Sequence, residues 1–146
     1  MDKKKVLFLC THNAARSQMA EGLLRSLYGN LYEVYSAGVT PSQVHPSAIA
    51  VMKEIHVDIS SHRSKSIDEF KTICFDYVIT VCDHAKATCP FFPGKKIIHH
   101  SFKDPTTLSE FRKIRDEIKT WIQTTFKDPN TLDHIPSYLS SSSIKL

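Results

Sequence analysis

Short segments rich in β-branched and aromatic residues alternate along this chain with longer segments of helical periodicity. Strands are predicted at residues 4–9, 32–37, 76–81 and 95–101. Helices are predicted at residues 15–27, 46–55 and 107–126. This alternation favours parallel pairing, because a helix can carry the chain back to the start of the next strand. The sequence therefore predicts an α/β fold: a single domain with a four-stranded parallel open sheet, doubly wound, with helices on both faces.

The length of 146 residues is sufficient for one hydrophobic core without disulfide bonds. We expect residues 1–128 to form one folded domain. Residues 129–146 contain a serine run and two prolines, so we expect a loosely docked or mobile tail.

The charge and the hydropathy pattern limit the possible partners. Nineteen Lys and Arg residues against 15 Asp and Glu residues give a formal net charge of +4, which suits a small anionic substrate. No basic stripe with interleaved aromatic residues is present, so we expect no nucleic acid partner. The amino-terminal apolar run is too short for a secretory signal, and no segment reaches membrane-spanning length. We therefore expect a cytoplasmic protein, without membrane contact, whose four cysteines are reduced.

Residues 10–17 read CTHNAARS and directly follow the first predicted strand. A strand-to-helix turn directs several backbone N–H groups into one space, so this loop is suited to a tetrahedral oxyanion. Arg16 offers a planar guanidinium for the same anion. The amides and the helix dipole are expected to lower the pKa of Cys10, making it a nucleophile to which Ser17 donates a hydrogen bond. The loop contains no glycine, so Asn13 is predicted to adopt a positive φ.

The oxyanion-binding residues predicted on this basis are Thr11, His12, Asn13, Ala14, Ala15, Arg16 and Ser17. Two further features follow predicted strands and therefore fall at the same edge of the sheet. Cys82 follows the third strand, and Asp104, held extended by the next residue, Pro105, follows the fourth. The alternative interpretations are a small buried thiol and a simple turn.

The segment VLFLCTHNAARSQMAEG resembles the phosphate-binding loop of the low-molecular-weight tyrosine phosphatase superfamily, which includes thioredoxin-linked arsenate reductases. The resemblance extends through YSAG at 35–38, DISSHRSKSI at 58–67, VITVCDHAKATCP at 79–90 and FKDP at 102–105. It implies that residues 1–128 are the catalytic domain, that Cys10 is the nucleophile, and that Asp104 is the general acid. We expect neither a metal ion nor an organic cofactor at this site.

Cys82 and Cys89 distinguish the two branches of this superfamily. A phosphatase needs one nucleophile and water, whereas a reductase needs further thiols to transfer two electrons. By resemblance to the reductases, Cys10 attacks arsenate, Cys82 attacks Cys10 as arsenite leaves, and Cys89 attacks Cys82. An external reductant, thioredoxin or glutaredoxin with glutathione, then reduces the Cys82–Cys89 disulfide. Phosphate and sulfate are expected to compete with arsenate.

The spacing of Cys82 and Cys89 also has a conformational consequence. In a continuous helix, residues seven apart are separated by about 10.5 Å along the axis. A disulfide requires Cα atoms within about 7 Å. If residues 83–88 are helical in the reduced protein, the disulfide requires that segment to unwind. The helix would be too short to be stable alone.

Three functions remain open at this point. Ala14 and Ala15 leave the loop without a second cysteine, and Thr106 and Thr107 follow the Asp-Pro pair where the phosphatases typically have tyrosines; both departures favour a reductase. A tyrosine phosphatase is the alternative enzyme, and a non-catalytic anion sensor is the alternative from another class. Some of the reductases bind potassium near the loop, and Lys65 occupies the position of one expected ligand. Its ammonium either replaces that ion beside Glu21 or is an exposed surface charge.

Overall fold

The computed structural model describes residues 2–82 and 94–136. The strands are β1 (Lys4–Cys10), β2 (Tyr32–Gly38), β3 (Phe75–Thr80) and β4 (Gly94–His99). The helices are α1 (Arg16–Tyr28), α2 (Pro46–Lys53), α4 (Leu108–Thr125), α5 (Pro129–His134) and the 3-10 helix η1 (Ile67–Phe70). All strands pair in parallel in the order β2-β1-β3-β4. The predicted four-stranded parallel sheet is confirmed, and each predicted segment overlaps an observed element of the same type.

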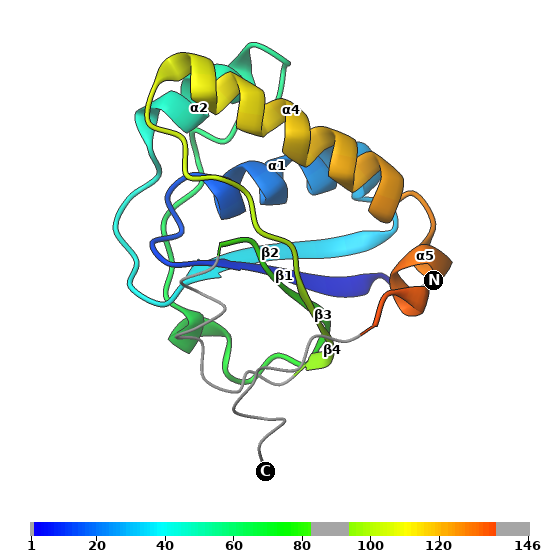
Figure 1. The fold of residues 1–146 in the computed structure, drawn as a ribbon. Coiled ribbons are helices and arrows are strands. Elements are labelled where there is room, and N and C mark those ends of the chain that lie inside the picture. The colour runs from blue at the N-terminus through cyan, green and yellow to red at the C-terminus, as the bar shows by residue number, and fades with distance from the viewer. Residues whose placement is uncertain (1, 83–93, 137–146) are drawn as a thin grey trace.

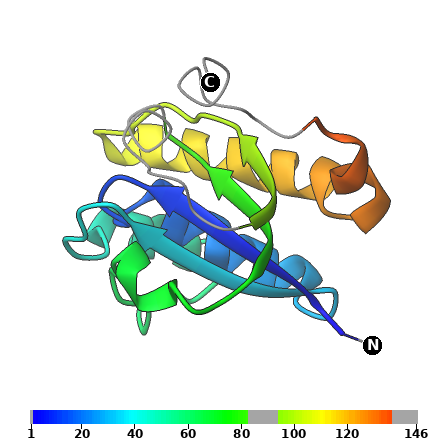
Figure 2. The same cartoon turned by 90° about the horizontal axis from the view of Figure 1, so that it is seen from below.

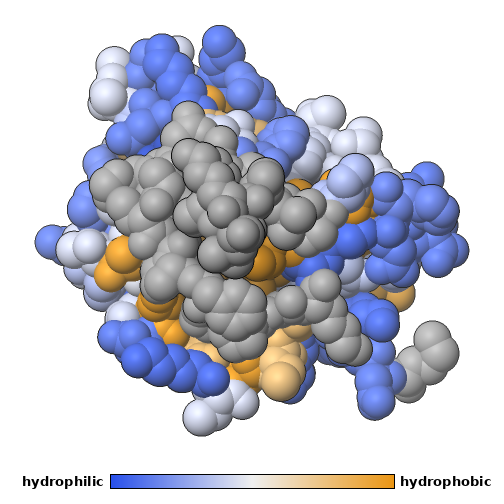
Figure 3. Space-filling view, turned by 60° about the horizontal axis from the view of Figure 1, so that its bottom comes forward, coloured by the Kyte–Doolittle hydropathy of each residue, from blue (hydrophilic) through white to orange (hydrophobic). Residues whose placement is uncertain are grey.

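The three long helices lie on one face of the sheet. Figure 1 shows α1, α2 and α4 on this face and η1 on the other, and Figure 2 shows the same layers from below. The sequence predicted helices on both faces of the sheet. In the described part of the chain both faces do carry a helix, but the three long helices lie on one face and the short η1 lies on the other. On the η1 face, residues of β1 and β3 pack against the partly buried side chains of Tyr35, Phe70 and Ile73. Because these side chains already cover apolar residues of the sheet, a short 3-10 helix is sufficient to complete the cover on this face. Figure 3 shows apolar surface on this side of the molecule, flanked by hydrophilic residues.

The main core lies between the sheet and the long helices. Alternating residues of β1, Val6, Phe8 and Cys10, face this core, whereas Leu7 and Leu9 face the η1 side. The Phe8 ring packs edge-to-face against Trp121 of α4 and against Phe126, which follows α4. These contacts hold α4 against β1, the strand that leads into the loop at residues 10–16.

Folded structure continues beyond residue 128. The helix α5 covers residues 129–134, and its Leu132 is fully buried. The Asp133 carboxylate accepts a 2.6 Å hydrogen bond from the Tyr77 hydroxyl, and the Lys96 ammonium donates to the Leu132 carbonyl oxygen. The first residues of the predicted tail are therefore docked, because one apolar side chain and two polar contacts tie them to β3 and β4. Residues 137–146 lie outside the described residues.

None of the helices in residues 2–82 and 94–136 combines the length and the apolar character needed to cross a bilayer.

Candidate active site

The loop from Cys10 to Arg16 joins β1 to α1 and is held by the segment that follows β2. The N–H groups of Val39, Thr40, Ser42 and His45 donate, respectively, to the carbonyl oxygens of Cys10, Thr11, His12 and Ala14. Among the described residues, the N–H groups of residues 12–15 have no hydrogen-bond acceptor. A concave loop with satisfied carbonyl groups and available amides at a helix N-terminus is an anion-binding arrangement.

Asn13 maintains the shape of this loop. Its φ is 51°, so the predicted left-handed conformation is confirmed. Its side chain is fully buried, and its Nδ2 donates to the hydroxyl oxygens of Ser17 and Ser36, both at 2.9 Å. Its Oδ1 accepts from Gln18 Nε2 and from the Lys65 backbone N–H, both at 2.9 Å. These four hydrogen bonds offset the cost of the strained backbone.

Ser17 has a different partner from the one predicted. We expected its hydroxyl to donate to the Cys10 thiolate, but the described residues show no such hydrogen bond. The Ser17 oxygen instead accepts from Asn13 Nδ2. The prediction was wrong because Ser17, in the first turn of α1, has its hydroxyl oxygen 2.9 Å from Asn13 Nδ2.

Arg16 is positioned by two partners on the segment after β4. Its Nη1 donates to the Phe102 carbonyl oxygen at 2.9 Å, and its Nη2 lies 3.7 Å from an Asp104 carboxylate oxygen. The Arg16 Nε–H is buried and has no acceptor in the part of the chain that the structure describes. A buried donor without a partner is costly, so this atom indicates a site for an anionic oxygen. The Asp104 side chain is 72% exposed, which leaves its carboxyl group in contact with solvent.

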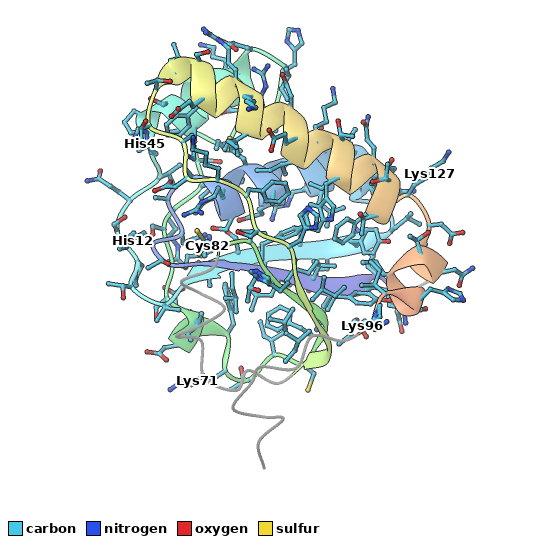
Figure 4. The ribbon with its side chains drawn as sticks, in the orientation of Figure 1. His12, His45, Lys71, Cys82, Lys96 and Lys127 are labelled. Carbon is cyan, nitrogen blue, oxygen red and sulfur yellow. The ribbon has the colours of Figure 1, made fainter. Side chains whose placement is uncertain are left out.

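Cys82 lies beside Cys10 at the end of the neighbouring strand. The Val81 N–H donates to the Leu9 carbonyl oxygen at 2.9 Å and extends the β1–β3 pairing by one step. The Cys10 and Cys82 side chains are in hydrogen-bond contact, and the Thr11 hydroxyl lies 3.4 Å from the Cys82 sulfur. Neither cysteine forms a disulfide. Figure 4 shows Cys82 and His12 at the same end of the sheet.

This contact changes the expected acidity of Cys10. The hydrogen bond with Cys82, followed by burial, raises the pKa of Cys10 above its ordinary value, while Arg16 and the Thr11 N–H act in the opposite direction. The predicted lowering of this pKa is therefore wrong for the reduced pair. The loop amides were considered in that prediction, but the neighbouring thiol was not, and two adjacent thiols resist losing both protons.

Lys65 lies beneath the loop and is not an exposed surface charge. Its side chain is 12% exposed, and its Nζ lies 3.7 Å from an oxygen of Glu21, whose side chain is 8% exposed. The Ser36 hydroxyl donates to the same Glu21 oxygen at 2.5 Å, which links this ion pair to Asn13. The site does not suit a potassium ion, because an ammonium group already lies beside the carboxylate and Asn13 Oδ1 already accepts two hydrogen bonds.

Two contributors to the site were not predicted from the sequence. One is the segment 39–45, which holds the loop carbonyl groups and carries no recognisable motif. The other is Gly38, where a Cβ atom would lie within 2.8 Å of the Asn13 nitrogen and of the Thr11 carbonyl oxygen. In the sequence, a glycine directly after the predicted strand at 32–37 was the feature that could have indicated this close approach of two backbone segments. Cys89 and the segment 83–88 lie outside the described residues.

Comparison with known proteins agrees with this geometry. Residues 5–133 match the family described as low molecular weight phosphotyrosine protein phosphatase. Arsenate reductase 2 of Staphylococcus epidermidis is 45% identical over 126 residues, which cover 84% of this chain and 96% of that protein.

Two solved structures extend the comparison. One, described as an arsenate reductase in the phosphate binding state, has a TM-score of 0.73 at 34% identity and covers 83% of this chain and 95% of that chain. The thioredoxin-dependent arsenate reductase of Corynebacterium glutamicum has a TM-score of 0.70 at 34% identity, covering 86% of this chain and 61% of that one. The resemblance inferred from the sequence is confirmed: this chain belongs to the low molecular weight phosphotyrosine protein phosphatase family.

Proposed function

We propose that this chain reduces arsenate to arsenite, with Cys10 as the nucleophile and Cys82 as the second thiol. The observation that carries the proposal is the contact between these two side chains beside an anion-binding loop. Hydrolysis of a phosphate ester needs one thiol, whereas reduction of a bound oxyanion needs two electrons from a thiol pair. The relatives named arsenate reductase support the same substrate.

Arsenate is held by the N–H groups of the loop that have no hydrogen-bond acceptor among the described residues. These are the N–H groups of residues 12–15 and the buried Nε–H of Arg16, and each can donate to an arsenate oxygen. Phosphate and sulfate have the same tetrahedral shape and charge, so they compete for these donors. The Asp104 carboxyl group, next to Arg16, supplies the proton that the leaving oxygen requires.

The electrons move in three steps. The Cys10 thiolate bonds to arsenic(V), and one oxygen leaves as water. The Cys82 sulfur then attacks the Cys10 sulfur, so the S–As bond breaks and its electron pair leaves with arsenic as arsenite. Finally Cys89 attacks Cys82, which releases the Cys10 thiol and leaves a Cys82–Cys89 disulfide. An external thiol reductant, either thioredoxin or glutaredoxin with glutathione, reduces that disulfide. We place the reaction in the cytoplasm, where thiols stay reduced.

The test is arsenate turnover coupled to each reductant, with arsenite as the measured product. Cys10→Ser, Cys82→Ser and Cys89→Ser should each abolish multiple turnover. Cys74→Ser is the matched control, because Cys74 is exposed and precedes β3 at the opposite end of the sheet from Cys82. Unchanged arsenite production by Cys82→Ser would contradict the proposed relay.

A tyrosine phosphatase is the alternative that the family match supports. In that reaction Cys10 forms a cysteinyl-phosphate that water hydrolyses, and Cys82 has no chemical role. Vigorous hydrolysis of p-nitrophenyl phosphate by both wild type and Cys82→Ser, with no arsenite from any variant, would identify the phosphatase. An anion response that persists in Cys10→Ser would instead identify a sensor.

A further inference from the structure

The segment between β4 and α4 carries two groups that contact Arg16. The Phe102 carbonyl oxygen accepts from Arg16 Nη1 at 2.9 Å, and an Asp104 carboxylate oxygen lies 3.7 Å from Arg16 Nη2. Among the described residues, no hydrogen bond involves Lys103 or Asp104 themselves. The position of the Asp104 carboxyl group therefore depends on how the residues before and after it are held.

Phe102 is fixed at the start of this segment. Its N–H donates to the carbonyl oxygen of Val81, the residue that follows β3, at 3.1 Å. Phe102 is buried, and its ring packs edge-to-face against Trp121 of α4, with the ring centroids 5.4 Å apart. The backbone of Phe102 is thus tied to the sheet and its side chain to α4.

Glu110, in the first turn of α4, fixes the other end of the segment. Its Oε1 accepts from the Thr106 N–H at 2.8 Å, from the Thr106 hydroxyl at 2.7 Å and from the Thr107 N–H at 3.3 Å. The Thr107 hydroxyl oxygen accepts from the Glu110 N–H at 3.1 Å, which completes a capping box. A capping box needs only the bonds with Thr107. The two shorter bonds go to Thr106, which precedes the helix, so Glu110 also holds the chain before α4.

Only three residues separate Phe102 from Thr106. Pro105 fixes its own φ and keeps Asp104 extended, so few backbone torsions are free between the two fixed ends. We propose that Glu110 is a positioning residue that acts through Thr106 to hold the Asp104 carboxyl group where it protonates the leaving oxygen. This inference rests on the proposed function of Asp104 and adds the residue that places it.

The proposed role affects the chemical step more than binding. Proton transfer is sensitive to geometry, and a misplacement of about 1 Å can cost about 100-fold in rate. The oxyanion, in contrast, is bound by the loop amides and Arg16. Hydrogen bonds from Thr106, followed by that from the Thr107 N–H, lower the pKa of Glu110 to about 2. The Glu110 carboxylate therefore stays ionised between about pH 5 and pH 9, and its own titration does not shape the pH dependence in that range.

The experiment measures single-turnover arsenite formation by the reduced full-length protein, as a function of arsenate concentration and pH. Glu110→Ala should lower the saturating rate at least about fivefold and change the half-saturating arsenate concentration less than about twofold. Glu110→Gln should keep at least about half of the wild-type rate, because its amide oxygen accepts the same hydrogen bonds. Thr107→Ala is the matched control. It removes the helix cap but leaves Glu110 bonded to Thr106, so it should lower stability without slowing the reaction.

A double-mutant cycle tests whether Glu110 acts through Asp104. Asp104→Asn alone should slow the reaction at least about tenfold, because the amide does not supply the proton. In the Asp104→Asn background, Glu110→Ala should cost less than about twofold more, and the pH dependence of the two variants should be the same. The proposal is overturned if Glu110→Ala keeps the wild-type rate, or if Glu110→Ala costs the same factor in both backgrounds.

The same variants distinguish failure of this proposal from failure of the proposed function. Equal rates for wild type and Asp104→Asn would refute the role of Asp104, and with it the role of Glu110. If wild type forms no arsenite, the proposed arsenate reduction fails. The variants are then compared with phenyl phosphate as substrate, whose leaving group also requires a proton, and the same two criteria decide on Glu110.

Discussion

Gly38 and Asn13 are in direct backbone contact: a Cβ atom on Gly38 would lie 2.8 Å from the Asn13 nitrogen. The same atom would lie 2.8 Å from the Thr11 carbonyl oxygen. These are backbone atoms of the anion loop, so they cannot move aside without deforming the loop. The absence of a side chain at Gly38 therefore sets the shape of the oxyanion site.

Gly38→Ala should weaken phosphate binding at least about tenfold, which corresponds to about 1.4 kcal/mol. Overpacking should also lower the free energy of unfolding by about 1–3 kcal/mol. Isothermal titration calorimetry and thermal unfolding measure the two effects. Gly22→Ala is the matched control, because its Cβ would meet the Ile59 and Val57 side chains in the core, away from the loop. It should destabilise the fold without changing phosphate affinity, and equal affinity losses in both variants would contradict the role of Gly38.

Cys82→Ala should lower the pKa of Cys10. The contact with Cys82 is the largest cause of the raised pKa, and its removal leaves Arg16 and the Thr11 N–H favouring the thiolate. The pH at which Cys10 alkylation by iodoacetamide reaches half its maximum rate should therefore move downward, as followed by site-resolved mass spectrometry. Cys74→Ala should leave the profile unchanged. An upward shift in Cys82→Ala would mean that Cys82 stabilises the thiolate.

Lys65→Met should lower the free energy of unfolding at pH 7 by about 1–2 kcal/mol. It removes one of two cations beside the buried Glu21 carboxylate, while the Arg25 guanidinium stays 2.6 Å from that carboxylate. Phosphate affinity should fall as well, since Glu21 holds Ser36 and Ser36 holds Asn13. Lys71→Met removes an ammonium of the same type from an exposed pair with Asp68. Urea unfolding should detect less than about 0.5 kcal/mol in this control, and similar losses in the two variants would refute a structural role for the buried pair.

Asn13→Ala and Asn13→Gly separate the two functions of Asn13. Both substitutions remove the four side-chain hydrogen bonds, but only alanine resists the φ of 51°. We expect Asn13→Ala to be about 1 kcal/mol less stable than Asn13→Gly, in line with the cost of the left-handed conformation for a residue with a Cβ. Chemical denaturation of both variants measures the difference. Equal stabilities would indicate that the loop relaxes to another conformation.

The fold class and the position of the anion loop follow from local sequence. The period-2 and period-3.6 patterns, read within short windows, give the strands and helices, and their alternation gives a parallel sheet. The loop is predictable because CTHNAARS carries its thiol, its guanidinium and its one residue suited to positive φ within eight positions. Each of these inferences depends on neighbours in the chain.

The acidity of Cys10, the true partner of Ser17 and the support from residues 38–45 were decided only by the tertiary structure. Each depends on groups that are distant in sequence and adjacent in space: Cys82 lies 72 positions from Cys10, and it reaches that thiol because β3 pairs beside β1. Strand order and side-chain packing depend on interactions throughout the whole core. A short window of sequence includes only a few of the residues that make those interactions. For this reason the sequence determined which groups could react, and the fold decided which of them meet.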